Sequence, residues 1–300
     1  MLATVVAVSR GDDHDALASS LGPPGGPYVA LGDSCTAGPN IPARNGRPAG
    51  CDRSDRNCPA LVAAELGVAA DEFRDMSCTG AVMGDLFASQ TTDRGVNPAQ
   101  LSALSPKTRL VTLGFGGNDI GFSSLMKTCV SAGLGYQLES CFDGDVDDAP
   151  CRARYVSAGT DDVTSRIKVA GGRLAVALSD VRRRAPEARG YGVGYQAILP
   201  AQGNHCDRAM GLAPGDVGFL RENEQQLNAM LRDRAKAVGA GYVDTCTPSV
   251  GRDACADRAV RWIEPLIPQA SAASVRPNER GERGMARVVL DVMKAPRAAD

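Results

Sequence analysis

The sequence predicts an α/β fold in which a parallel β-sheet carries helices on both faces. Short apolar runs alternate with segments of helical periodicity along the chain, and this alternation is typical of strands joined by crossover helices. The chain has 300 residues and a hydrophobic content of 43%, values that suit a globular protein with a full core. We expect strands at 27–32, 73–77, 108–114, 190–198 and 241–244, and helices at 59–66, 161–184, 216–238 and 279–293.

Local signals support individual elements. Residues 27–32 read PYVALG, an apolar run that ends at a glycine. The helix predicted at 216–238 follows Pro214 and Gly215, and Asp216 suits its first turn. Its apolar side chains recur at helical spacing, at Phe219, Leu227, Met230 and Leu231.

Two segments depart from the alternation and are predicted to be loops. Residues 39–58 are rich in Pro, Gly, Arg and Asn. Residues 122–160 contain three cysteines, several glycines and an acidic cluster, DGDVDD, and a loop of this length is typically a lid or a binding loop. The cluster lacks the glycine and the terminal Glu of an EF-hand, so a solvated acidic surface is favoured over a calcium site.

Charge and hydropathy exclude several classes of function. The formal net charge of −2 offers no electrostatic basis for binding nucleic acid or an anionic membrane. No apolar run reaches the length of a membrane span. We therefore expect no nucleic-acid partner and no stable membrane insertion. A monomer is expected because nothing in the sequence argues against one.

The ten cysteines indicate an oxidising compartment. None forms a CxxC pair and the chain has two histidines, so a zinc site is not predicted. Disulfides explain the count better, and they predict a secreted or extracytoplasmic location. Residues 1–26 are interpreted as an N-terminal tail or the remnant of a signal peptide, because MLATVVAV is apolar but short, lacks a basic n-region and is followed at once by the polar GDDHD.

A candidate nucleophile follows the first predicted strand. Gly32-Asp33-Ser34 ends the apolar run, and small residues as far as Gly38 allow a sharp turn into a helix. Backbone N–H groups at such a turn favour negative charge, which the oxyanion of a serine-catalysed reaction requires. The alternative is an ordinary turn in which Ser34 only caps a helix.

Two further motifs follow other predicted strands. Gly80 closes the segment 78–80, and Asn118 lies in the GGND segment 116–119. Ligands bind beyond the carboxyl ends of parallel strands, so we expect these residues to meet Ser34 there. The N–H groups of Ser34 and Gly80 and the Asn118 amide could form a three-donor oxyanion hole. Each motif alone would be read as a turn.

Together these motifs resemble the SGNH (GDSL) hydrolase family, in its secreted actinobacterial esterase, lipase and phospholipase branch. The resemblance implies a three-layer α/β/α sandwich with a flavodoxin-like parallel sheet. It also implies a single domain over 27–296 with a lid-like loop at 122–160. The blocks that carry it are GDSCTAG at 32–38, SCTGA at 77–81, GGNDIGF at 116–122, LAPGDVGFLRENEQQLN at 212–228, RWIEPLIP at 261–268 and RPNERGERGMA at 276–286.

The same resemblance implies a chemistry. Ser34 would be the nucleophile, with Ser34, Gly80 and Asn118 as the oxyanion donors, and a small ester or lipid would be hydrolysed through an acyl-enzyme without a metal or organic cofactor. Three disulfides are implied, Cys51–Cys78, Cys129–Cys151 and Cys206–Cys255, which leaves Cys35, Cys58, Cys141 and Cys246 over.

The chain departs from the family at the general base. Family members have His before Pro-Asn, where this chain has Arg276. Imidazole can take a proton near neutral pH, whereas guanidinium stays protonated and only donates hydrogen bonds. We therefore predict that Arg276 cannot act as the base and that esterase activity is weak or absent. Of the two histidines, His14 is expected on the surface, and His205, beside Cys206, is the alternative candidate for the base.

Two functional hypotheses stay open. The first is a serine esterase or lipase, impaired by Arg276. The second is a catalytically silent SGNH-fold protein that binds an acyl or glycan ligand, and binding without turnover would distinguish it. Cys35 has no evident basic partner, so we interpret it as a small packed residue and not as a thiol nucleophile. A flavodoxin-like cofactor protein is excluded because no GxGxxG follows the first strand.

Overall fold

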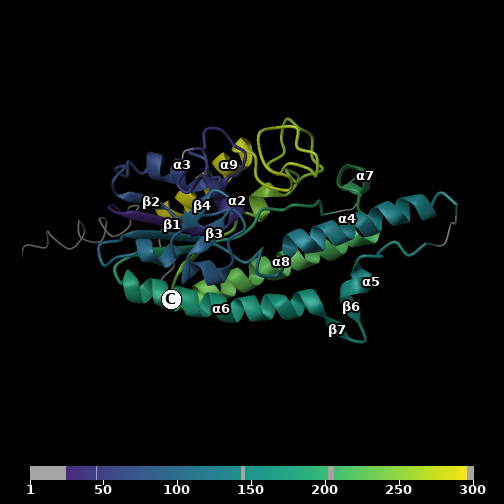
Figure 1. The fold of residues 1–300 in the computed structure, drawn as a ribbon, viewed down its shortest axis with the longest axis horizontal. Helices are drawn as coiled ribbons and strands as arrows, with labels where there is room; N and C mark the ends of the chain where they lie inside the picture. Colours follow the sequence, from purple (N-terminus) through teal and green to yellow (C-terminus); the bar gives the residue numbers. More distant parts are fainter. Residues whose placement is uncertain (1–24, 45, 143–145, 202–205, 296–300) are drawn as a thin grey trace, which may run out of the picture.

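A five-stranded sheet, parallel throughout, forms the centre of the fold (Figure 1). The computed structural model describes residues 25–44, 46–142, 146–201 and 206–295. The strand order is β2-β1-β5-β8-β9, so the direction in which strands are added to the sheet reverses between β1 and β5. Sheets of this type bind ligands at the carboxyl ends of the strands on either side of such a reversal. The strands are β1 (Tyr28–Gly32), β2 (Phe73–Asp75), β5 (Leu110–Gly114), β8 (Arg189–Val193) and β9 (Gly241–Val243).

Helices cover both faces of the sheet, so the predicted α/β/α sandwich is confirmed (Figure 1). Side chains along β1 alternate between the two cores, as the pleat of a strand requires. Tyr28 and Ala30 belong to one hydrophobic cluster, and Val29 and Leu31 belong to the other. The first cluster includes residues of α3 (Cys58–Glu65) and α9 (Glu279–Lys294), and the second includes residues of α6 (Asp162–Arg184) and α8 (Pro214–Ala237).

The predicted strands and helices are all present, and the largest difference in their ends is at β8. The sequence predicted a strand to residue 198, but β8 leaves the sheet after Val193. The neighbouring strand β9 ends at Val243, whose carbonyl accepts the Gly194 N–H. Beyond it, the Tyr195 N–H and C=O bond to the Asn228 side chain, at 2.8 and 3.0 Å, instead of to another strand.

The prediction of a loop over 122–160 is wrong for much of that segment. Helix α4 spans Phe122–Glu139, and it is followed by α5 (Arg152–Tyr155) and by a hairpin of β6 (Val156–Ser157) and β7 (Thr160–Asp161). Gly133 looks like a helix breaker in the sequence, but it lies where a Cβ would come within 2.3 Å of the Gly211 carbonyl oxygen. Residues 143–145 of the acidic cluster lie outside the described residues.

No helix in the described ranges combines the length and apolar character needed to cross a membrane.

The remaining elements are short and lie between the main strands and helices. The short elements are α2 (Ser34–Ala37), η1 (Ala49–Cys51), η2 (Met83–Leu86), β3 (Gln90–Thr92), β4 (Gly95–Asn97), η3 (Gln100–Ala103), α7 (Cys206–Met210) and η4 (Thr247–Ser249).

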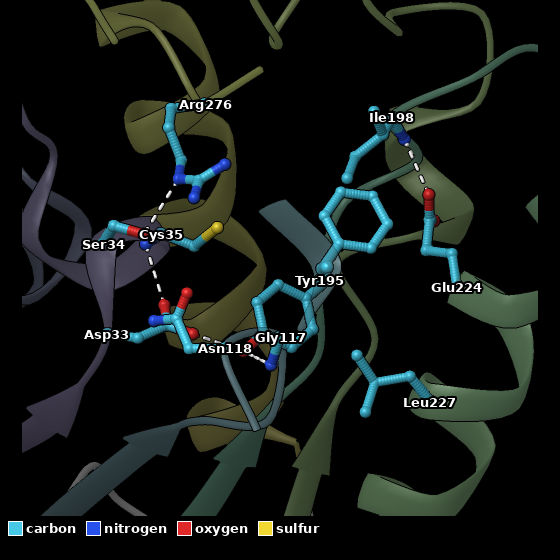
Figure 2. A pocket seen from close by; sticks show the side chains of 11 residues that line it. Asp33, Ser34, Cys35, Gly117, Asn118, Tyr195, Ile198, Glu224, Leu227 and Arg276 are labelled. Atoms are coloured by element: carbon cyan, nitrogen blue, oxygen red, sulfur yellow. Dashed lines mark hydrogen bonds between the residues drawn. The ribbon is translucent and has the colours of Figure 1, made fainter. Parts of the chain in front are cut away.

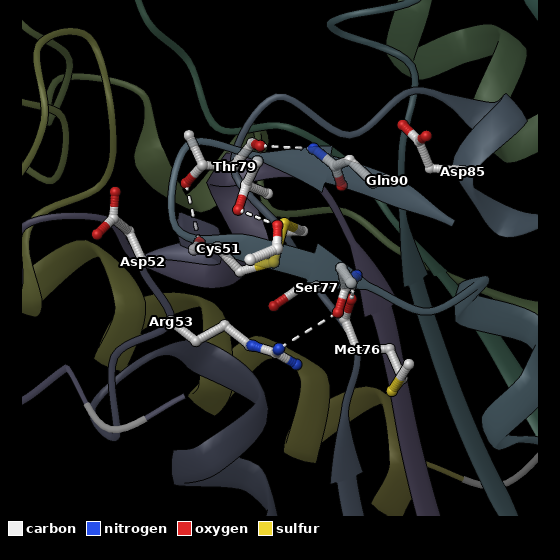
Figure 3. The surroundings of a disulfide bond; sticks show 12 residues. Cys51, Asp52, Arg53, Met76, Ser77, Thr79, Asp85 and Gln90 are labelled. Atoms are coloured by element: carbon white, nitrogen blue, oxygen red, sulfur yellow. Dashed lines mark hydrogen bonds between the residues drawn. A yellow bond between two sulfur atoms is a disulfide. The ribbon is translucent and has the colours of Figure 1, made fainter. Parts of the chain in front are cut away.

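The described residues contain three disulfides, and these join the pairs that the family resemblance implies. One of them ties the turn after β2 to η1 (Figure 3). At this place the Thr79 N–H and hydroxyl both donate to the Cys51 carbonyl, and the Gln90 amide donates to the Thr79 carbonyl at 2.9 Å. The turn that carries Gly80 is therefore held from two sides. The disulfides are Cys51–Cys78, Cys129–Cys151 and Cys206–Cys255, and the free thiols are Cys35, Cys58, Cys141 and Cys246.

Candidate active site

Ser34 is the first residue of α2, directly after β1 and the Asp33 cap. The Asp33 carboxylate accepts the Cys35 N–H at 2.8 Å, which fixes the start of the helix. Gly32 is required before this turn, since a Cβ there would lie 2.3 Å from the Thr36 hydroxyl. Its N–H and C=O are both bonded to the buried Gln100 side chain, at 2.9 and 3.0 Å. The strand end is thus rigid, and Ser34 is only 3% exposed.

Arg276 lies against Ser34 (Figure 2). Its Nε–H donates to Ser34 Oγ over 2.8 Å, and Nη1 donates to the Val275 carbonyl at 2.9 Å. Nη2 reaches the Ser123 hydroxyl at 3.4 Å, a longer contact. The direction of the first bond matters, because the guanidinium gives a hydrogen bond to the serine oxygen and has no lone pair with which to take its proton.

Of the predicted oxyanion residues, the structure brings Ser34 and Asn118 together in one pocket, and Gly80 is not among the residues that line it. Arg276 lines the same pocket, and the Asn118 amide nitrogen donates to the Ala81 carbonyl at 2.9 Å. Gly80 lies in the turn closed by the Ala81 N–H on the Cys78 carbonyl. Among the described residues, the backbone N–H groups of Ser34 and Gly80 have no hydrogen-bond acceptor.

A tyrosine connects the two turns of the site. The Tyr195 hydroxyl donates to Asp33 Oδ2 at 2.5 Å and accepts the Gly117 N–H at 2.8 Å. Burial raises the pKa of Asp33, and the hydrogen bonds from Tyr195 and Cys35 oppose that shift. Burial, followed by the nearby Asp33 charge, raises the pKa of Tyr195, so the phenol keeps its proton and remains a donor.

The far wall of the pocket is mostly apolar, with one acid (Figure 2). Ile198 and Leu227 lie across from Ser34, and Phe122 also lines the space. Glu224 is 4% exposed, and burial raises the pKa of its carboxyl to about 8. Its Oε2 accepts the Ile198 N–H at 2.9 Å.

Cys35 also lines the pocket, but it is not arranged as a nucleophile. Burial, with the Asp33 charge as the next cause, raises the pKa of its thiol. A thiolate is therefore disfavoured at this position. Across the described ranges, no group of three or more His, Cys, Asp or Glu side chains is placed to hold a metal ion. Both histidines, His14 and His205, lie outside the described residues, so the alternative base is not placed.

A serine at a strand end, the Asn118 amide in the same pocket and an apolar pocket wall suit acyl transfer. A family model described as "GDSL-like Lipase/Acylhydrolase family" matches residues 30–283. The chain belongs to this family.

Several Streptomyces proteins resemble this GDSL-family chain. Lipase 2 of Streptomyces coelicolor is 38% identical over 268 residues, which are 89% of this chain and 85% of that protein. The crystal structure of an extracellular lipase from Streptomyces rimosus covers 89% of this chain and all of its own, with 26% identity and a TM-score of 0.71. A phospholipase A1 from Streptomyces albidoflavus covers 89% and 98%, with 27% identity and a TM-score of 0.70.

Three residues that shape the GDSL-family site were missed in the sequence. Tyr195 follows β8 in an apolar stretch, and only its position after a strand end could have indicated it. Glu224 is one of several acids on α8, and its place on the apolar side of that helix, between Leu220 and Leu227, was the available signal. Gln100 lies in a short helix that no pattern predicts.

Proposed function

We propose that this chain is a serine carboxylic-ester hydrolase in which Ser34 is the nucleophile and turnover is impaired by Arg276. The Ser34 and Gly80 N–H groups and the Asn118 amide are the oxyanion donors. The observation that carries the proposal is the 2.8 Å bond from Arg276 Nε to Ser34 Oγ, since it puts this side chain where a general base must be.

The substrates we propose are small esters or lipids, and the location is secreted or extracytoplasmic. The apolar pocket wall of Phe122, Ile198 and Leu227 suits an acyl chain. The three disulfides favour an oxidising compartment, and the similar lipase from Streptomyces rimosus is extracellular.

The test restores an imidazole. The wild-type protein and the Arg276→His variant are assayed on p-nitrophenyl butyrate. We expect little turnover by the wild type and a gain of about 10²–10⁴-fold in the variant, the usual contribution of general acid–base catalysis. The gain should disappear when Ser34→Ala is added.

The matched control is Arg276→Gln, which removes the charge and the bulk without supplying a base. If this variant gained as much activity as Arg276→His, relief of obstruction and not proton transfer would be responsible. Robust and equal turnover by the wild type and Arg276→His would overturn the proposed impairment.

A further inference from the structure

We infer that the Ser34 pocket binds the carboxylate of an acyl chain, with Arg276 as the cation that holds it. The inference rests on the proposed function because it uses the same pocket, but it concerns a bound anion instead of a hydrolysed ester. Arginine at this position changes what the pocket can recognise, since an imidazole near neutral pH offers at most a partial positive charge.

The first argument is that Arg276 is a partly buried cation with no carboxylate in direct ion-pair contact among the described residues, although its charge opposes the rise in the pKa of the buried Asp33 carboxyl. Its hydrogen-bond acceptors are all neutral: the Ser34 hydroxyl, the Val275 carbonyl and, at 3.4 Å, the Ser123 hydroxyl. In the part of the chain that the structure describes, no carboxylate lies within 4.0 Å of its guanidinium. A guanidinium removed from water gains most from a planar carboxylate that accepts two N–H groups.

The second argument is that the acids of the pocket do not take this role. Both oxygens of Asp33 already accept hydrogen bonds, from the Cys35 N–H and the Tyr195 hydroxyl. Glu224 lies on the opposite side of the pocket in Figure 2. Because burial raises its carboxyl pKa to about 8, Glu224 is mostly neutral at pH 6.5 and does not repel an anion there.

The third argument is the apolar lining next to Arg276. Beyond Arg276 the pocket is walled by Phe122, Ile198 and Leu227. A carboxylate between Arg276 and the proposed oxyanion donors would direct its hydrocarbon chain toward this wall. The ligand class is therefore a monocarboxylate with an apolar tail.

The test measures binding by calorimetry at pH 6.5. The ligands are octanoate and octanamide, which has the same hydrocarbon chain but a neutral amide in place of the carboxylate. We expect the wild type to bind octanoate at least tenfold more tightly than octanamide. Arg276→Gln should lose that preference, and Arg276→Lys should keep part of it because it keeps the charge. Arg258→Gln changes an exposed arginine of a separate surface pocket and should bind octanoate like the wild type.

Two outcomes would overturn the inference: equal affinities of the wild type for octanoate and octanamide, or undiminished octanoate binding by Arg276→Gln. Thermal unfolding of each variant checks that its fold is intact. Failure of the proposed function would look different. In that case Arg276→His would stay inactive toward p-nitrophenyl butyrate, while binding of octanoate to the wild type would be unaffected.

Discussion

The Tyr195 hydroxyl joins the Asp33 carboxylate to the backbone of Gly117, with contacts of 2.5 and 2.8 Å. Asp33 directly precedes Ser34, and Gly117 directly precedes Asn118. One hydroxyl therefore sets the position of the proposed nucleophile relative to a proposed oxyanion donor. Displacements well under 1 Å matter in such a site, so we expect Tyr195 to act as a positioning residue.

Replacing Tyr195 with Phe should impair turnover more than substrate binding. The change leaves the buried Asp33 Oδ2 and the Gly117 N–H without their partner, which costs about 1–3 kcal/mol of folding free energy. In the Arg276→His background we expect kcat for p-nitrophenyl butyrate to fall about tenfold, the effect of about 1.4 kcal/mol, with KM nearly unchanged.

The control for this prediction is Tyr28→Phe. The Tyr28 hydroxyl is also buried and bonded, to the Thr112 hydroxyl at 2.7 Å, but it lies at the start of β1, away from the pocket. It should lower stability by a similar amount and leave kcat unchanged. Equal losses of kcat in both variants would show that Tyr195 contributes only to stability.

Gly80→Ala tests whether the backbone N–H of residue 80 is an oxyanion donor, because the substitution changes the preferred backbone conformation and adds no clash. Gly80 has φ +79°, and a Cβ there would meet only the Gln90 amide, at 3.8 Å. The cost is therefore strain in a left-handed conformation, about 1 kcal/mol, and not a clash. The alanine backbone relieves this strain by leaving the left-handed conformation, which turns the residue 80 N–H away from the proposed oxyanion position. In the Arg276→His background we therefore expect kcat to fall. Gly84→Ala, equally uncrowded but without a positive φ, should match the parent.

Much of the fold could be predicted because its signals are local. The apolar alternation of β1 and the Pro214 start of α8 depend on residues within a few positions of each other. Ser34 and Asn118 also lie in short motifs directly after strands. Arg276 could be assigned to the same site only through the family resemblance, since its bond to Ser34 spans 242 residues.

The parts that could not be predicted depend on tertiary contacts. Tyr195 looks like an ordinary apolar residue until its hydroxyl meets Asp33, 162 positions away. Glu224 is one acid in a charged helix until its carboxyl meets the Ile198 N–H and the Cys246 thiol, in the segments that follow β8 and β9. The glycines of α4 have the composition of a loop, and only packing against Gly211 and its neighbours explains Gly133 in a helix.

Glu224 should make the protein less stable as the pH rises. Burial raises its pKa from an ordinary 4.5 to about 8, so between these values the folded state binds the proton that the unfolded state has lost. The free energy of unfolding must therefore decrease with pH across this window, by at most ~1.4 kcal/mol per pH unit from this group. Glu224→Gln cannot ionise, so its stability relative to the wild type should rise from pH 5 to pH 8.

Urea unfolding at pH 5, 6, 7 and 8 measures this difference. Glu222→Gln, which removes an exposed carboxyl from the same helix, is the matched control for the loss of one carboxyl. A Glu224→Gln difference that stays constant from pH 5 to pH 8 would mean that the Glu224 carboxyl is already ionised in the folded protein at pH 5.

The two glycines of α4 should respond to alanine with opposite signs. At Gly133 a Cβ would lie 2.3 Å from the Gly211 carbonyl oxygen and 2.7 Å from the Leu212 Cα, which are backbone atoms that cannot move separately. Gly133→Ala should therefore lower the free energy of unfolding by ~1–3 kcal/mol. At Gly135 nothing lies within 4 Å, so alanine should raise it by about 0.5–1 kcal/mol through helix propensity. Urea unfolding of both variants measures these changes in the free energy of unfolding. Similar small changes in both variants would contradict the prediction and would fit a loop at this place better than a packed helix.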